Sequence, residues 1–186
     1  MVKVEISLAN FYRLLHPYRA TLISCTSEDG KVNVMAAAWV MPLSRNPPLL
    51  AVSIAPSRYT HELIRKTGEF VVNIPTAELI DQVYLCGSIS GRETDKLAKA
   101  GLTTEKAKEV KSPLIKDCIA HIECKLEKEV EAGDHTLFIA RVLRAIVDEG
   151  VFDVKRCLYK LEKAKPLLHL GGRLFTTARE VREAKG

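Results

Sequence analysis

Many signatures of common enzyme classes are missing from this chain. It has no Gly-x-Gly-x-x-Gly fingerprint after a strand, no Walker loop, no Gly-x-Ser-x-Gly and no zinc-binding spacing. The five histidines show no His-Glu-x-x-His pattern, so we expect no metal site. No uncharged run approaches the ~20 residues that span a bilayer. The usual dinucleotide- and nucleotide-binding folds are therefore not expected, and we expect no membrane segment.

The cysteines follow no recognisable spacing. The five cysteines form no Cys-x-x-Cys and leave one unpaired, so we expect reduced and mostly buried thiols. The N-terminal segment carries Lys3 and Glu5, which is unlike a secretory signal. Both features favour the cytoplasm.

Length and composition indicate one globular domain. The 186 residues are 47% hydrophobic and 27% charged, with no linker or composition shift, so we expect a single domain over residues 1–186 that ends in a polar tail at 178–186. The net charge of +5 is mixed along the chain, and the pI near 8.9 is only mildly basic. We therefore expect no nucleic-acid partner, although the basic excess suits anionic cofactors.

Strand-like patterns dominate the chain. Residues 20–27 and 31–41 flank the hairpin signal Asp29-Gly30, and Pro42 is expected to end the second strand. Further strands are expected at residues 49–55, 69–74, 136–147, 152–158 and 167–175. Residues 118–130 alternate apolar and polar side chains, which predicts a half-buried strand with His121 and Glu123 facing solvent.

Helix signals are few. A helix is expected from an N-cap at Ser57 to about residue 66, with Gly68 just beyond its end. Others are expected at residues 76–86 and 94–100, with a frayed end or a surface helix at 179–186. Many hairpin-connected strands with few helices favour a closed or nearly closed antiparallel barrel.

The segment Pro56-Ser57-Arg58-Tyr59-Thr60 could hold an anion. A helix start offers unpaired N–H groups and the positive end of the helix dipole. The Ser57 and Thr60 hydroxyls and the Arg58 guanidinium would add donors around a phosphate monoester. The alternative, favoured by this segment alone, is that Ser57 caps the helix and Arg58 is solvated.

The run Met35-Ala36-Ala37-Ala38-Trp39 contains three alanines, which pack poorly and have a low propensity for strands. A flat ring lying along the backbone would fill such a space, and a crowded barrel interior would also need small residues. Trp39 is the only tryptophan, and core packing is its favoured role.

Two more segments could border a ligand. The loop Cys86-Gly87-Ser88-Ile89-Ser90-Gly91-Arg92 is rich in glycine and serine, and Arg92 and Lys96 could reach the same anion as Arg58. His135 follows a turn between two long strands. The alternatives are an ordinary surface loop and a solvated histidine, and Cys86 has no base beside it in the sequence.

Together these segments resemble the flavin reductase-like, FMN-binding split-barrel family, which includes flavoredoxin and archaeal ferric reductase. The resemblance runs from about Tyr12 to Phe175. It rests on NVMAAAWV, NPPLLAVSIAPSRYTHELI, FVVNIP, CGSISGRETDKLAKAGL, SPLI and GDHTLFIARV in that order. It implies a mainly β fold with helical insertions, a six-stranded antiparallel Greek-key split barrel that forms a homodimer with FMN near the interface.

The resemblance also implies a set of FMN-binding residues. Asn33, Met35, Ala36, Ala37, Ala38 and Trp39 would line the isoalloxazine; Ser53 would face the ribityl chain; Ser57, Arg58 and Thr60 would hold the phosphate with Ser90, Arg92 and Lys96 nearby; Cys86, Gly87, Ser88 and His135 would border the flavin. Relatives often carry Thr and Ser where this chain has three alanines, and Tyr at Phe175, so side-chain contacts from those positions are not expected.

The implied activity is that of an FMN-dependent oxidoreductase. Electrons would pass from NAD(P)H through FMN to free flavin, a ferric chelate or a protein partner, with no certain catalytic side chain beyond a candidate role for His135. Two alternatives remain open. One is a flavoredoxin-type electron carrier without NAD(P)H activity, and the other is a binding or structural barrel without flavin.

Overall fold

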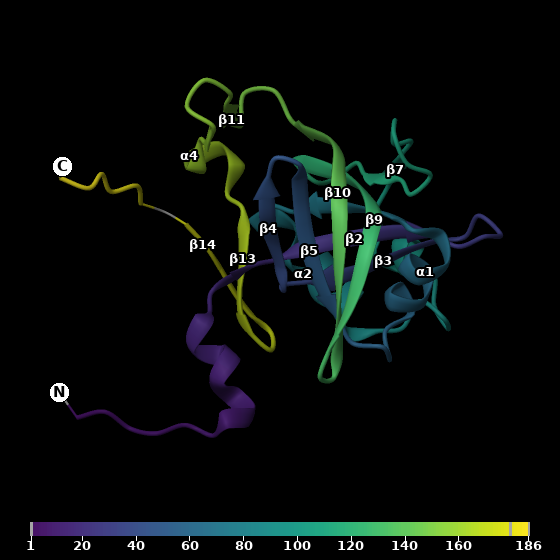
Figure 1. Cartoon of the computed structure of the whole chain (residues 1–186). Helices are drawn as coiled ribbons and strands as arrows, with labels where there is room; N and C mark the ends of the chain where they lie inside the picture. Colours follow the sequence, from purple (N-terminus) through teal and green to yellow (C-terminus); the bar gives the residue numbers. More distant parts are fainter. Residues whose placement is uncertain (1, 179, 186) are drawn as a thin grey trace.

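The computed structural model describes residues 2–178 and 180–185. Its centre is a seven-stranded antiparallel sheet in the order β3-β2-β6-β9-β10-β5-β4 (Figure 1). The strands are β2 (Thr21–Thr26), β3 (Val32–Ala37), β4 (Val40–Arg45), β5 (Pro48–Ile54), β6 (Glu69–Ile74), β9 (Ala120–Ala132) and β10 (His135–Val147). The expected mainly β split barrel with helical insertions is confirmed.

The strand expected at residues 31–41 is divided in two. Ala38 and Trp39 separate β3 from β4, and these two halves form opposite ends of the sheet order. Counted as one bent strand, they give the six strands of the expected barrel. The expectation that Pro42 ends the strand is wrong, because Pro42 lies inside β4 opposite Leu50. An edge strand tolerates proline, since one row of its N–H groups has no partner strand.

Helix α1 (Tyr59–Thr67) begins later than expected. The N-cap is Arg58 rather than Ser57, and no side chain caps it. The Arg58 N–H donates to the Ala55 carbonyl (3.0 Å) in a turn. The helix therefore begins after this turn, one residue later than expected. Gly68 ends it in the left-handed conformation with φ 69°, as expected.

The second helical segment also differs in its bounds. A short 3-10 turn, η2 (Ala77–Leu79), is capped by Thr76 and leads into α2 (Ile80–Ser88). The Ile89 N–H still donates to the Leu85 carbonyl at 3.3 Å. Gly87 therefore does not end the helix, and Cys86, Gly87 and Ser88 belong to its last turn rather than to a loop. Helix α3 (Lys96–Ala100) is capped by Asp95 and ends at Gly101.

The barrel interior forms the main core. Phe70 and Phe138 are fully buried there, and Leu63 and Ile64 of α1 pack against it. The other face of β9 is covered by the segment that holds β7 (Thr104–Glu105) and β8 (Leu114–Ile115).

The expectation that His121 and Glu123 face solvent is wrong, because that covering segment buries them to 6% and 0% exposure. The N–H groups of Lys108 and Glu109 donate to Glu123 Oε2 at 3.0 and 2.6 Å, and Arg144 donates to Oε1 at 2.9 Å. The buried carboxylate is thus fully paired, as burial of a charge requires.

The remaining elements lie at one side of the barrel. The strand expected at residues 152–158 is a small hairpin, β11 (Phe152–Asp153) and β12 (Leu158–Tyr159), followed by α4 (Leu161–Ala164). The strand expected at residues 167–175 is a hairpin of β13 (Leu167–Gly171) and β14 (Leu174–Thr177). Strand β1 (Tyr18–Arg19) pairs with β13 and completes a three-stranded sheet.

The two chain ends extend from the same side of the barrel (Figure 1). An unexpected 3-10 helix, η1 (Leu8–Leu15), lies in the N-terminal arm, and none of its residues is buried. Residues 180–185 form no helix, while positions 179 and 186 of the expected tail lie outside the described residues. None of the helices in the described ranges has both the length and the apolar character needed to cross a bilayer.

Candidate functional site

Two adjoining cavities lie along the end of β3, where α2 packs against it. We call them the polar cavity, of about 200 Å³, and the alanine cavity, of about 260 Å³. The polar cavity is lined by Met35, Ser57, Arg58, Tyr59, Thr60, Cys86, Gly87, Ser88, Ile89, Ser90, Gly91 and Lys96. The alanine cavity is lined by Ala20, Ala36, Ala37, Ala38, Val83, Tyr84, Gly87, Ser88, His169, Gly172 and Phe175.

Gly87 and Ser88 line both cavities, so the two spaces meet at the last turn of α2. A Cβ built on Gly87 would lie 3.2 Å from the Cβ of Ala36. Because α2 and β3 approach this closely, larger side chains at Gly87 or Ala36 would push the two elements apart. The small residues at this point therefore keep the helix against the strand.

The polar cavity gathers the hydroxyls and cations that the sequence grouped as an anion site. Ser57 and Arg58 are exposed at the start of α1, whereas Thr60 is only 1% exposed. Lys96 is 5% exposed, and its ammonium group donates to the carbonyl of Cys86 at 2.9 Å. Burial lowers the pKa of Lys96; the thiols of Cys86 and Cys25 counteract this, and the charge of Arg58 lowers it further.

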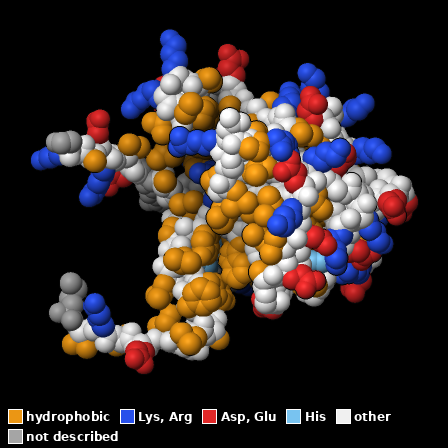
Figure 2. Space-filling view, viewed as in Figure 1, with side chains coloured by type: hydrophobic (Ala, Val, Ile, Leu, Met, Phe, Trp, Pro, Cys, Tyr) orange, Lys and Arg blue, Asp and Glu red, His pale blue; other side chains and the backbone are white. Residues whose placement is uncertain are grey.

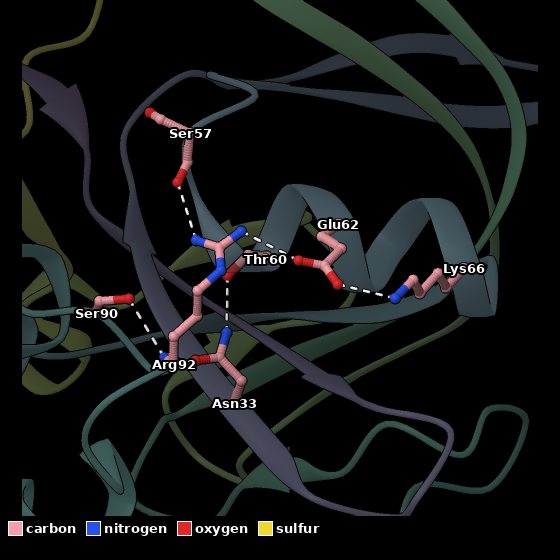
Figure 3. Close-up of polar contacts among 7 residues, drawn as sticks. All are labelled: Asn33, Ser57, Thr60, Glu62, Lys66, Ser90 and Arg92. Carbon is pink, nitrogen blue, oxygen red and sulfur yellow. Dashed lines mark hydrogen bonds and ion pairs between the residues drawn. The ribbon is translucent and has the colours of Figure 1, made fainter.

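Asn33 lines neither cavity but bonds to Thr60, which lines the polar cavity. Its amide nitrogen donates to the Thr60 hydroxyl oxygen at 2.8 Å (Figure 3). Its amide oxygen is buried, with no hydrogen-bond partner among the described residues. A Cβ on Gly91 would overlap that oxygen, so the loop over the cavity rests directly on Asn33. Only glycine leaves room for this approach.

Arg92 ties the loop to α1. Its guanidinium donates to the Ser57 carbonyl and to Glu62 Oε2, each at 3.1 Å, and lies 5.1 Å from the centre of the Tyr59 ring. Glu62 also accepts a hydrogen bond from Lys66, as Figure 3 shows. Arg92 lines neither cavity, and its contacts instead fix the loop across the start of the helix.

The alanine cavity has a strand edge on one side and a hairpin on the other. Among the described strands, β3 pairs only with β2, so the main-chain groups along its outer edge have no partner strand there. His169 and Phe175 of the β13–β14 hairpin form the opposite wall, with ring centroids 5.1 Å apart. Burial lowers the pKa of His169, which favours the neutral ring.

Sequence reasoning missed most of this wall. The signal was the pair Gly171-Gly172, which turns a hairpin with ring side chains at His169 and Phe175 on its two strands. The sequence led us to expect no side-chain contact from Phe175, yet its ring lines the cavity. Nothing in the pattern indicated that this hairpin lies against residues 36–38.

Three predicted residues form a separate group. The rings of Trp39 and His135 lie 4.8 Å apart, and the Ser53 N–H donates to the Trp39 carbonyl at 3.0 Å. None of the three lines either cavity. Trp39 is 37% exposed and Tyr12 lies against it, so the expected core role of Trp39 is wrong. The turn histidine is half-buried and packs against Trp39 in a tilted arrangement, rather than being fully solvated.

Four cysteines are buried and free, and Cys157 is free but exposed, which agrees with the expected thiols. Burial raises the pKa of Cys86 to about 11, with Lys96 acting in the opposite direction. A thiol with so high a pKa is protonated near neutral pH, so Cys86 is unsuited to act as a nucleophile.

Comparisons with known proteins give one consistent result. A family model described as "Flavin reductase like domain" matches residues 12–178. A relative from Archaeoglobus fulgidus, itself uncharacterised, is 47% identical over 148 residues, covering 80% of this chain and 82% of its own.

Solved structures agree. Flavoredoxin of Desulfovibrio vulgaris (Miyazaki F) superimposes with a TM-score of 0.86 at 28% identity, covering 97% of both chains. An FMN-binding protein of Thermus thermophilus, solved with bound 1-cyclohex-2-enone, gives a TM-score of 0.84 at 30% identity over 100% of this chain and 99% of that one.

Proposed function

The chain belongs to the flavin reductase-like family, and we propose that it binds FMN across the two cavities and works as a flavin-dependent oxidoreductase. The phosphate would occupy the polar cavity and the ring the alanine cavity. The observation that carries the proposal is a buried ammonium group, Lys96, that forms no ion pair with any carboxylate of the described residues.

An uncompensated buried cation destabilises a protein unless a counter-ion completes the site. The phosphate of FMN would supply that charge. Arg58 is free to reach it from the exposed start of α1, and the hydroxyls of Ser57 and Thr60 lie on the same wall. The first turn of α1 adds main-chain N–H groups at the positive end of its dipole.

The alanine cavity suits a flat ring. Its walls are mostly apolar, and the free edge of β3 offers main-chain N–H and C=O groups where alanine side chains leave room. The bound flavin would supply the redox chemistry through its ring. The protein's own residues would orient the ring between Ala37 and the His169 wall and exclude water from one face.

The phosphate contacts can be tested at Arg58. Titration of the apoprotein with FMN, followed by flavin fluorescence, should show that Arg58→Ala weakens binding by about tenfold or more, since a hydrogen bond to a charged group contributes roughly 1.5–3 kcal/mol. Arg65→Ala is the matched control, because Arg65 lies on the same helix but pairs with Glu129. Equal dissociation constants for wild type and Arg58→Ala would remove Arg58 from the site.

We propose NAD(P)H as the electron donor, with free flavin, a ferric chelate or a protein as acceptor. Anaerobic stopped-flow mixing with NADH or NADPH tests this. Bleaching of the flavin absorbance within seconds supports a reductase. A flavin that stays oxidised with both nucleotides contradicts NAD(P)H as donor.

A second candidate function is an electron carrier without its own NAD(P)H activity. The similarity to the flavoredoxin of D. vulgaris favours it. The same mixing experiment separates the two, because a carrier is reduced only by a protein or chemical donor. Colourless protein that stays colourless after incubation with FMN would falsify both flavin proposals.

We also propose that the protein forms a homodimer. The open end of the barrel is an apolar cavity of about 710 Å³, bordered by the exposed side chains of Met41 and Val154. The N-terminal arm carries exposed Leu8, Phe11 and Leu15. Figure 2 shows hydrophobic side chains gathered along the arm and over the barrel face beside it. A second copy would cover both apolar surfaces in a symmetric arrangement.

A further inference from the structure

We infer that Lys96 takes up a proton when a phosphate monoester enters the polar cavity, so that occupancy of the cavity is coupled to pH. This inference rests on the proposed FMN site and adds a proton to its binding equilibrium. The proton comes from the buffer. The new N–H bond at Lys96 Nζ is the one covalent bond that forms in this step.

The geometry of Lys96 is that of a cation that lacks its counter-ion. The residue begins α3, and its side chain passes under the loop, where a Cβ on Gly91 would lie 3.3 Å from Lys96 Cε. The ammonium group has a single acceptor among the described residues, the Cys86 carbonyl at 2.9 Å. Once Lys96 is protonated, two of its three N–H bonds therefore remain for a ligand in the cavity that it lines.

The groups that face Lys96 come from four elements. The Cys86 carbonyl and thiol lie on α2, the Cys25 thiol on β2, the Asn33 amide on β3, and the Arg58 charge before α1. None is a carboxylate. Burial lowers the pKa of Lys96, thiols that are protonated near neutral pH supply no counter-charge, and Arg58 acts in the same direction as burial.

A phosphate in the cavity reverses this balance. A phosphate monoester carries close to two negative charges above pH ~7, since its second pKa is about 6. An opposite charge within a few ångströms favours the protonated amine, so the pKa of Lys96 rises on binding. In the pH range between the two pKa values, binding takes up a proton, and affinity falls as pH rises.

Most other polar groups of the cavity cannot take this role. Arg58 keeps its charge at all relevant pH values. Ser57 and Thr60 do not titrate. The Cys86 thiol, with a pKa of about 11, is already protonated, and a nearby anion would keep it so. Tyr59 is the other titratable residue of the lining besides the thiol, and the Lys96→Arg variant separates its contribution from that of Lys96.

Isothermal titration calorimetry tests the coupling. Apoprotein is titrated with FMN at pH 7.5, 8.5 and 9.5, each in two buffers of different ionisation enthalpy, which gives the number of protons taken up. We expect a positive proton count and a dissociation constant that increases with pH, by at most tenfold per pH unit. A count of zero at all three pH values overturns the inference.

Lys96→Arg is the matched variant, because it keeps a cation that does not titrate. We expect it to bind FMN with a proton count near zero and a flatter pH dependence, after thermal unfolding confirms that it is folded. Equal proton counts in wild type and variant also overturn the inference, because the flavin ring is common to both titrations. FMN that binds without proton uptake leaves the proposed function intact, whereas FMN that does not bind at all contradicts the proposed function itself.

Discussion

Gly91 is the residue at which the loop over the polar cavity meets the barrel. Its backbone lies against the Asn33 amide and close to the Lys96 side chain, so it sets the distance between the loop and β3. Asn33 in turn holds the Thr60 hydroxyl. One small residue thus fixes the positions of two side chains that we place at the phosphate.

We predict that Gly91→Ala weakens FMN binding by about tenfold or more, because the added methyl group must displace the loop or Asn33. Fluorescence titration of FMN measures the effect. Asn33→Ala frees the space that the methyl group needs, so the double variant should bind better than the sum of the two single effects predicts. Strict additivity would contradict the close approach.

Glu123 illustrates a buried charge with a purely structural role. Burial alone would raise its pKa, but the N–H groups of Glu109 and Lys108 and the Arg144 guanidinium outweigh this, and the pKa is lowered. A carboxyl with a lowered pKa contributes stability above its unfolded pKa of about 4.3 and loses it as pH falls through the folded value.

We predict that Glu123→Ala lowers the free energy of unfolding by roughly 2–4 kcal/mol at pH 7, with less difference from wild type below pH ~4. Urea unfolding at several pH values measures this. Glu127→Ala on the same strand is the control, because Glu127 pairs with Arg141 at the surface, where a pair contributes about 0–1 kcal/mol. Equal effects of the two variants would contradict the role of Glu123.

For single residues, the sequence predicted which chemical groups form the polar cavity better than it predicted where each side chain lies. Ser57, Arg58, Thr60 and Lys96 do meet in one cavity, since a helix start and the following loop are local features. Ser53 and Trp39 do not line it, because a side chain's direction depends on the strand register. Register is set by pairing with distant strands, as Ser53 shows opposite Leu137.

At the scale of secondary-structure elements, Arg92 attaches the loop between α2 and α3 to the start of α1. Its contacts to the Ser57 carbonyl and Glu62 join this loop to the start of α1 (Figure 3). These hydrogen bonds link the two segments that border the polar cavity. Loss of this link would loosen the cavity without disturbing the barrel.

We predict that Arg92→Ala speeds amide hydrogen exchange in residues 89–95 by about tenfold, while the exchange of β6 and β9 stays unchanged. Mass spectrometry of peptic fragments measures it. Lys66→Ala is the control, because it removes the other partner of Glu62 but leaves the loop attached. Faster exchange throughout the chain would show general destabilisation instead.

The predictions for helices and strands were wrong where long-range packing determines the structure. The apolar pattern continues through Ala38 and Trp39, so nothing local indicates that the strand divides there. The polar face of β9 alternates as a solvated face would, but a segment from residues 104–116 covers it. Such coverage is a long-range fact, and a carboxylate satisfied by main-chain N–H groups leaves no sign in the pattern.

At the scale of the molecule, the N-terminal arm is the least explained part of a single copy. A 3-10 helix of eight residues with no buried side chain gains little stability by itself. Its residues Leu8, Phe11 and Leu15 are largely exposed, and the open barrel end is an apolar cavity. The strand-rich architecture was predictable from hairpin signals, whereas this arm carries no hairpin or alternating pattern.

We predict that the protein is a dimer and that Phe11→Glu with Leu15→Glu shifts it toward monomer, because burying two charges at an apolar interface is costly. Light scattering coupled to gel filtration measures the mass. Val181→Glu, in the exposed C-terminal segment, is the control. A monomeric wild type at all concentrations would contradict the proposed dimer.

The free edge of β3 has a consequence for solubility. An unpaired strand edge is a template on which another chain can add a strand, and proteins protect such edges with charges, bulges or covering segments. Here the outer edge of β3 carries alanines and lies at the alanine cavity, so a ligand seated there would cover the edge. Loss of the ligand would thus expose an edge at which aggregation could begin. Bound flavin would therefore lower the tendency of the protein to aggregate, in addition to its redox role.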